Sequence, residues 1–137
     1  MHRSRRPNEG RVLIDTSVWI TAASPDGDRV VRRTVRELVV TGQAATYEIV
    51  IAEVLRGAGS DGEAEAMEAE LRALDVLPCD GAGSMVAAMG RDMATPRQRI
   101  ADLFVAAVAW RHGAALLHSD RHLSQVAARF GIPETAM

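Results

Sequence analysis

The chain has 137 residues, of which 47% are apolar and 25% charged, and a formal net charge of −2; these values are typical of one globular domain and not of a strongly basic nucleic-acid-binding domain. No apolar run reaches the ~18 residues of a membrane-spanning helix, and Asp15 interrupts the apolar stretch after the arginine-rich start, so neither a membrane protein nor a secreted protein is expected. All 16 basic residues are arginine and Cys79 is the single cysteine, which excludes lysine chemistry, an internal disulfide and a cysteine zinc site, and agrees with a cytoplasmic location.

Short apolar segments alternate with longer segments that have helical periodicity. The first ten residues, which include Arg3, Arg5 and Arg6, are predicted to form a flexible basic arm, and residues 11–137 a single domain. In chain order, the domain is predicted to contain a strand over 11–15, helices over 16–23 and 28–42, a strand over 44–47, helices over 48–57 and 61–74, a strand over 75–79, a helix over 81–94, a basic loop over 95–99, a helix over 100–113, a strand over 114–119, a helix over 120–131 and a possible last edge strand over 132–135. Glycine and proline residues between these segments mark the breaks.

This alternation predicts an α/β fold in which a parallel sheet is covered by helices on both faces. In open parallel sheets the functional site lies beyond the carboxyl ends of the strands, near the point where the strand order reverses. Residues that directly follow a strand are therefore the first candidates for a site.

Four acidic residues stand in apolar surroundings. Asp15 lies at the end of the predicted strand "VLI" and Asp120 at the end of the predicted strand "ALLHS", Glu53 interrupts the apolar run "IVIAEVL", and Asp102 precedes the uncharged run "LFVAAVAW". Acidic residues are seldom buried unless they are paired or bind a metal. The alternatives are a helix cap for each aspartate and, for Glu53, an ion pair with Arg56 or another arginine.

A cluster of these acids would be unfavourable without a cation. Two carboxylates ~4 Å apart repel by roughly 4 kcal/mol at an effective dielectric constant near 20, which is a large fraction of the ~5–15 kcal/mol that stabilises a domain. A divalent cation removes this repulsion, and ligation by oxygen alone favours Mg²⁺ or Mn²⁺ over zinc. Such a site is typical of metal-assisted phosphodiester cleavage.

The stretches "VLIDTSVWI", "IVIAEVLRG" and "RIADLFVAAVAWRHGAALLHSDRHL", in this order and spacing, resemble the PIN-domain ribonucleases, specifically the VapC-like toxins of bacterial toxin-antitoxin pairs. The resemblance extends over nearly the whole chain. It implies a three-layer α/β/α sandwich with a central, mostly parallel, twisted sheet. The implied activity is Mg²⁺-dependent endonucleolytic cleavage of cellular RNA (tRNA, rRNA or mRNA) by a metal-activated water.

The resemblance also implies roles for individual residues. Its catalytic and metal-binding acids are Asp15, Glu53, Asp102 and Asp120, and its hydroxyl groups that position water or phosphate are Ser17 and Ser119. Our candidates for contacts with RNA phosphates are Arg56, Arg97 and Arg99. Many relatives have a further acid at the position of His122, so the site here has four acids and not five.

The implied partners are an RNA substrate, a cognate antitoxin protein and a second copy of the chain in a homodimer. Trp19 and the valines Val30, Val31 and Val35 are candidates for an apolar groove that accepts an antitoxin helix, with core packing as the alternative. A phosphorelay receiver is excluded because the chain has no lysine. A PIN-like module that binds RNA or protein without cutting, and a nuclease that cuts DNA, stay open as alternatives.

Overall fold

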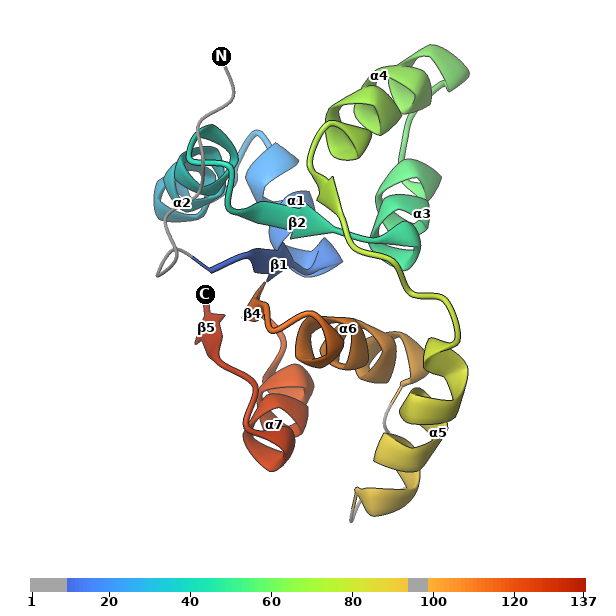
Figure 1. The fold of residues 1–137 in the computed structure, drawn as a ribbon. Coiled ribbons are helices and arrows are strands. Elements are labelled where there is room, and N and C mark those ends of the chain that lie inside the picture. Colours follow the sequence, from blue (N-terminus) through green and yellow to red (C-terminus); the bar gives the residue numbers. More distant parts are fainter. Residues whose placement is uncertain (1–9, 94–98) are drawn as a thin grey trace.

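The computed structural model of the chain describes residues 10–93 and 99–137 (Figure 1). The predicted basic arm, apart from its last residue, and Arg97 lie outside these ranges. The elements are β1 (Val12–Ile14), α1 (Thr16–Ala23), α2 (Arg29–Val40), β2 (Ala44–Thr46), α3 (Glu48–Arg56), α4 (Asp61–Arg72), β3 (Asp75–Val76), α5 (Ala82–Asp92), α6 (Ile100–Arg111), β4 (Ala115–His118), α7 (Arg121–Phe130) and β5 (Glu134–Ala136). Among the described residues, no helix is long and apolar enough to cross a membrane.

The described strands form one parallel sheet in the order β3-β2-β1-β4-β5. In the register of the two central strands, Leu13 of β1 lies opposite Leu116 of β4. The strand order reverses between β1 and β4, because β2 and β3 extend the sheet on one side of β1 while β4 and β5 extend it on the other. The predicted α/β class with a parallel sheet is confirmed, and the carboxyl ends of β1 and β4 mark the switch point of the sheet.

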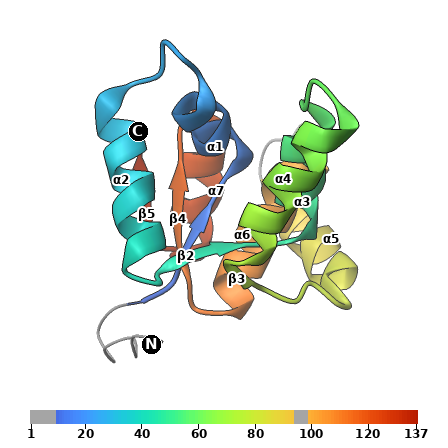
Figure 2. The ribbon, with the colours of Figure 1, turned by 90° about the horizontal axis from the view of Figure 1, so that it is seen from above.

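Helices cover both faces of the sheet (Figure 2), and alternate residues of the central strands pack against the two helical layers. Ile14 and Leu117 belong to an apolar cluster with α1 and α2. Leu13 and Leu116 belong to a larger cluster that includes residues of α3, α5, α6 and α7. This alternation follows from the two-residue period of a strand. It gives the three-layer sandwich that the resemblance implied.

Local sequence signals explain most element boundaries. Asp15, Asp28, Ser60 and Asp120 cap the N-termini of α1, α2, α4 and α7 through side-chain oxygens. The ambiguous segment near residue 50 is a helix, α3. Strand β3 is shorter than the predicted 75–79, because Pro78 has no amide hydrogen to continue the ladder.

Two further predictions need correction. The last strand, β5, is shifted from 132–135 to Glu134–Ala136, since the amide of Ile132 bonds the carbonyl of Ala127 at the end of α7 and closes that helix first. Val31 and Val35 are buried in the core beneath α2. They therefore do not contribute to an exposed groove.

Candidate active site

The candidate active site lies at the switch point of the sheet. Asp15 follows β1, and its amide donates a hydrogen bond of 2.9 Å to the carbonyl of Leu117 in β4. Asp120 follows β4, so the two central strands present acids at the same edge. The cleft there has a volume of about 220 Å³ and is lined by Asp15, Thr16, Ser17, Ile20, Tyr47, Glu53, Arg99, Ala101, Asp102, Val105 and Asp120. All four acids singled out in the sequence line this one cleft.

Asp15 and Asp120 are helix caps as well as residues of the cleft. Oδ2 of Asp15 accepts hydrogen bonds from the amide of Ser17 at 3.2 Å and from the Ser17 hydroxyl at 2.6 Å. Oδ1 of Asp120 accepts from the amide of His122 at 2.8 Å. In each aspartate the cap uses one carboxylate oxygen, and the second oxygen takes no part in it. The capping alternative is thus correct for these two residues and compatible with a second role.

Asp102 does not cap its helix. It lies in the first turn of α6, whose N-cap residue is Arg99. Burial raises the pKa of Asp102, and the charges of Asp120 and Asp15 raise it further, whereas Arg99 and His122 act in the opposite direction. Asp120 and Asp15 are therefore close enough to Asp102 to destabilise its charged form.

Glu53 is turned toward α1. Its Oε1 accepts a hydrogen bond of 2.8 Å from the hydroxyl of Thr16. Within the part of the chain that the structure describes, no ion pair joins Glu53 to Arg56 or to another arginine, so the ion-pair alternative is not supported there. Arg56 lines a neighbouring hollow that shares Glu53 with the cleft.

Two polar residues of the cleft were not singled out from the sequence as site residues, Thr16 and Tyr47. Tyr47 follows β2 and is almost completely buried. Burial raises its pKa well above the ordinary value, and the charges of Glu53 and Asp15 add to this effect. Tyr47 thus keeps its proton at physiological pH. The rule that residues after strands line the site points to Tyr47 only when the strand ends at Thr46, as β2 does, whereas the predicted strand 44–47 included Tyr47.

The other predicted site residues differ in how they reach the cleft. Ser17 lines it, and Arg99 stands in its wall beside Asp102. Ser119 contributes its backbone amide, which donates a hydrogen bond of 3.2 Å to the Ser17 hydroxyl. The side chain of Ser119 is exposed and is not part of the cleft wall.

The donor set of the cleft suits a hard divalent cation, because it offers carboxylate and hydroxyl oxygens and no sulfur. Burial, and then the charges of Asp120 and Asp15, raise the pKa of Asp102, and a cation beside it would favour its charged form. As the side chains of residues 10–93 and 99–137 lie, no three acidic, histidine or cysteine groups are clustered tightly enough to hold an ion by direct contacts alone. Water ligands or side-chain rotation would complete the shell, and Mg²⁺ commonly keeps several waters in proteins.

Comparison with known proteins identifies the family. Residues 12–129 match the family model of the PIN domain. The chain belongs to the PIN-domain family and is VapC-like. It is 32% identical over 124 residues to Ribonuclease VapC11 of Mycobacterium tuberculosis strain H37Rv, with 85% of this chain and 91% of the relative aligned. VapC ribonuclease Mb1587 of Mycobacterium bovis aligns with the same identity and coverage.

Solved structures confirm the PIN-like fold. VapBC2 from Rickettsia felis, solved with a DNA fragment from its promoter, superposes with a TM-score of 0.69 at 13% identity and covers 92% of this chain and 98% of its own. VapBC-5 from Mycobacterium tuberculosis superposes with a TM-score of 0.62 at 23% identity, covering 93% and 99%. At these identities the likeness establishes the shared fold.

Proposed function

We propose that this VapC-like PIN domain is a divalent-metal-dependent endoribonuclease that acts as the toxin of a toxin-antitoxin pair. The observation that carries the proposal is the convergence of Asp15, Glu53, Asp102 and Asp120 on one cleft at the switch point of the sheet. Relatives named as VapC ribonucleases that align with most of the chain support the same activity. We further propose that the protein works in the cytoplasm on cellular RNA, namely tRNA, rRNA or mRNA.

The residues of the cleft fit this reaction. Asp15, Glu53 and Asp102 would hold a Mg²⁺ or Mn²⁺ ion, directly or through water, and Asp120 would help to place a second ion or the attacking water. When bound, such an ion neutralises charge on the phosphate and increases the acidity of a coordinated water. The Ser17 hydroxyl lies beside Asp15 and orients its carboxylate.

Positive charge near the acids would contact the RNA backbone. Arg99 stands in the wall of the cleft, and Arg56 is exposed beside the adjoining hollow. Both can donate hydrogen bonds to phosphate oxygens, which position the RNA without selecting its sequence. Arg97 and the Ser119 hydroxyl, which were predicted to take part, keep this role as predictions.

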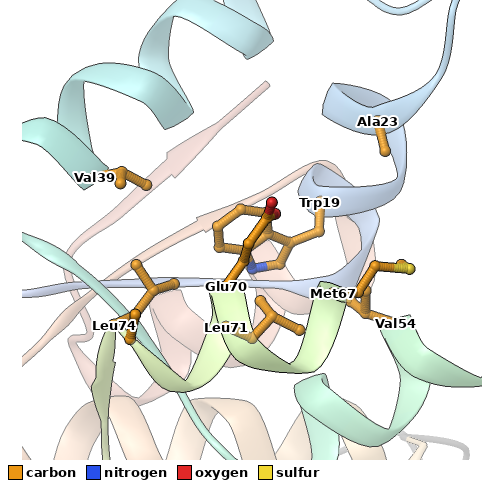
Figure 3. A pocket seen from close by; sticks show the side chains of 9 residues that line it. Trp19, Ala23, Val39, Val54, Met67, Glu70, Leu71 and Leu74 are labelled. Atoms are coloured by element: carbon orange, nitrogen blue, oxygen red, sulfur yellow. The ribbon is translucent and has the colours of Figure 1, made fainter. Parts of the chain in front are cut away.

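An apolar pocket away from the acids supports an antitoxin partner. It has a volume of about 480 Å³ and is lined by Trp19, Ala23, Val39, Val54, Met67, Glu70, Leu71, Ala73 and Leu74 (Figure 3). The Trp19 indole Nε1 is buried and has no hydrogen-bond partner among the residues that the structure describes. We propose that an apolar antitoxin segment occupies this pocket and that the toxin pairs with a second copy; the family resemblance supports the homodimer.

The test is cleavage of RNA by purified protein in Mg²⁺ or Mn²⁺, with mapping of new 5′ ends. We expect Asp15→Asn and Asp102→Asn each to reduce the cleavage rate by about 100-fold or more, as loss of a residue that holds a metal in place does. Glu65→Gln is the matched control, because Glu65 is an exposed acid of α4 outside the cleft. Excess EDTA is expected to abolish cleavage.

Two results would contradict the proposal. Cleavage at the wild-type rate by Asp15→Asn or Asp102→Asn would place the active site elsewhere, and full activity in EDTA would exclude a metal requirement. A single-stranded DNA of the same sequence, tested in the same assay, distinguishes a ribonuclease from a nuclease that cuts DNA: cleavage of the DNA and not of the RNA would favour the second. Binding of RNA without cleavage under all metal conditions would favour the non-catalytic module.

A further inference from the structure

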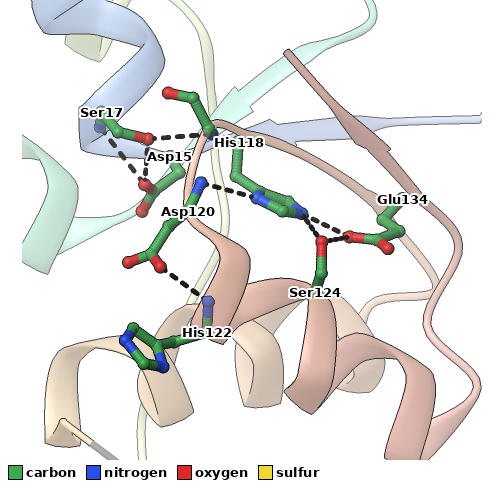
Figure 4. Close-up of polar contacts among 8 residues, drawn as sticks. Asp15, Ser17, His118, Asp120, His122, Ser124 and Glu134 are labelled. Carbon is green, nitrogen blue, oxygen red and sulfur yellow. Dashed lines mark hydrogen bonds and ion pairs between the residues drawn. The ribbon is translucent and has the colours of Figure 1, made fainter.

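A buried histidine lies behind the cleft and contacts groups on two elements. His118 is the last residue of β4 and has no exposed surface. Its Nδ1 is 3.1 Å from the amide nitrogen of Asp120, and its Nε2 contacts the carboxylate of Glu134 in β5 (Figure 4). His118 is not part of the cleft wall.

These contacts define the tautomer of His118. A backbone amide can only donate, so Nδ1 must accept from Asp120 and carry no proton. The proton of the neutral ring then lies on Nε2, where it is donated to Glu134. Ser124 donates a hydrogen bond of 3.0 Å to the same carboxylate. The hydrogen bonds from His118 and then from Ser124 lower the pKa of Glu134, so this group stays an acceptor.

The pairing of β5 with β4 places Glu134 within reach of the His118 ring. β5 is the edge strand that pairs with β4, and Glu134 lies opposite Leu116 in the register. The amide of Met137 donates to the carbonyl of His118 at 2.8 Å. The C-terminal strand therefore holds both the backbone and the ring of His118.

Successive residues of the connection between β4 and α7 are held by hydrogen bonds. The amide of Asp120 bonds His118, and the Asp120 carboxylate accepts from the amide of His122. One residue earlier, the amide of Ser119 bonds Ser17, whose hydroxyl bonds Asp15. The network joins the two acids that follow β1 and β4, and it ends at the C-terminal strand.

We propose that His118 and Glu134 are positioning residues: the Glu134 carboxylate holds the His118 ring in the Nε2–H tautomer, and His118 Nδ1 fixes the backbone of Asp120 so that its carboxylate faces the cleft. The proposal rests on the proposed function. His118 is not a general base in it, since the ring is buried and both ring nitrogens are engaged.

Amide substitutions separate positioning from packing. In His118→Asn the side-chain oxygen lies near the former Nδ1 and can accept from the Asp120 amide, whereas in His118→Gln the amide reaches toward Glu134 and leaves the Asp120 amide without its partner. We expect His118→Gln to lower kcat by about 10-fold or more, the usual effect of losing a partner that orients a site residue, with little change in KM. His118→Asn should retain most of the activity. His112→Asn is the control, because His112 bonds the carbonyl of Pro78 away from the cleft.

The spectroscopic test does not depend on cleavage. In wild-type protein, imidazole ¹⁵N shifts should report the Nε2–H tautomer of His118. Glu134→Ala, a change on an exposed strand, should increase the Nδ1–H tautomer and shift the amide resonance of Asp120. That resonance should also shift in His118→Gln and return toward the wild-type position in His118→Asn.

Each outcome of these experiments either overturns or supports the proposal. An Nδ1–H tautomer in wild type would overturn the positioning proposal, as would equal loss of kcat in folded His118→Asn and His118→Gln. If the wild-type protein cuts no RNA, the proposed function fails. The tautomer of His118 and the amide shift of Asp120 then still decide whether Glu134 and His118 hold the backbone of Asp120. The expected tautomer together with the Asn rescue supports the proposal.

Discussion

At the scale of residues, the acids of the cleft combine structural and chemical roles. Asp15 and Asp120 each use one carboxylate oxygen to satisfy a free amide at a helix start. Asp102 makes no such contact within the described residues and has a raised pKa. The charge of Asp102 is therefore poorly compensated, and the stability of the protein should depend on pH and on cations through this residue.

We predict that Asp102→Asn stabilises the metal-free protein at pH 7. The raised pKa of Asp102 means that the folded state holds its proton more strongly than the unfolded state does. This contribution to stability is fully present below the ordinary aspartate pKa of about 4, and it is lost as pH rises through the folded pKa. Thermal unfolding in EDTA should show Asp102→Asn and wild type melting alike near pH 3 and the variant melting higher at pH 7, by ~3 °C for each kcal/mol.

Addition of Mg²⁺ should narrow or reverse this difference, because only the wild-type protein has the Asp102 carboxylate to bind the ion, and binding to the folded state raises its melting temperature. Glu65→Gln serves again as the control, and its melting temperature should change with pH and with Mg²⁺ only as much as that of the wild-type protein. A variant that melts higher by the same amount at pH 3 and pH 7 would show that the charge of Asp102 is not the cause.

At the scale of elements, the packing of helices shapes the cleft. α6 carries Asp102 in its first turn and then five consecutive buried residues from Val105 to Ala109. Because three of these five are alanine, α6 can lie close to the sheet and its neighbours. On the other face, α1 and α2 are joined by a tight connection in which the amide of Gly27 bonds the carbonyl of Ser24 at 2.9 Å.

A pair of glycine substitutions tests this connection. A Cβ at Gly27 would lie 2.1 Å from the backbone carbonyl oxygen of Thr21, so Gly27→Ala should destabilise the protein by about 1–3 kcal/mol. A Cβ at Gly62 in α4 would meet no heavy atom within 4 Å, so Gly62→Ala should stabilise it by up to about 1 kcal/mol. Urea unfolding measures both. Equal effects of the two changes would show that the backbone near Gly27 can move aside.

At the scale of the whole molecule, the order of the strands in the sheet determines which strands are enclosed by their neighbours. β1 and β4 are paired on both sides, whereas β3 and β5 are edges with one partner each. The central strands are also covered by both apolar clusters. The acids at the switch point are thus attached to the most enclosed backbone of the molecule, while Glu134 lies on an edge.

We predict that hydrogen exchange follows this order. Amides of β1 and β4 that pair within the sheet should exchange only on global unfolding, and those of β5 should exchange through local opening that is several kcal/mol easier. Native-state exchange at low denaturant, read by NMR, measures the difference. Protection of β5 equal to that of β1 would mean that the edge strand opens only with the whole domain.

Much of this arrangement follows from the sequence. The alternation of apolar strands and periodic helices predicted the parallel α/β sheet, since each period reflects local backbone geometry. Asp15 and Asp120 were found because an acid directly after a buried strand must lie at the carboxyl edge. Glu53 and Asp102 were found because a charge within an apolar run needs a partner.

Other features depended on contacts between distant segments. The position of β5 and the contact of Glu134 with His118 join residues on different strands, and no local pattern specifies which edge a C-terminal strand will pair with. The Thr16 hydroxyl bonds Glu53 across two helices. Burial of Val31 and Val35 depends on which face of α2 meets the sheet. Sequence by itself determined the elements and the acids at their ends, because these depend on neighbouring residues; tertiary structure alone decided their partners, because packing brings distant segments together.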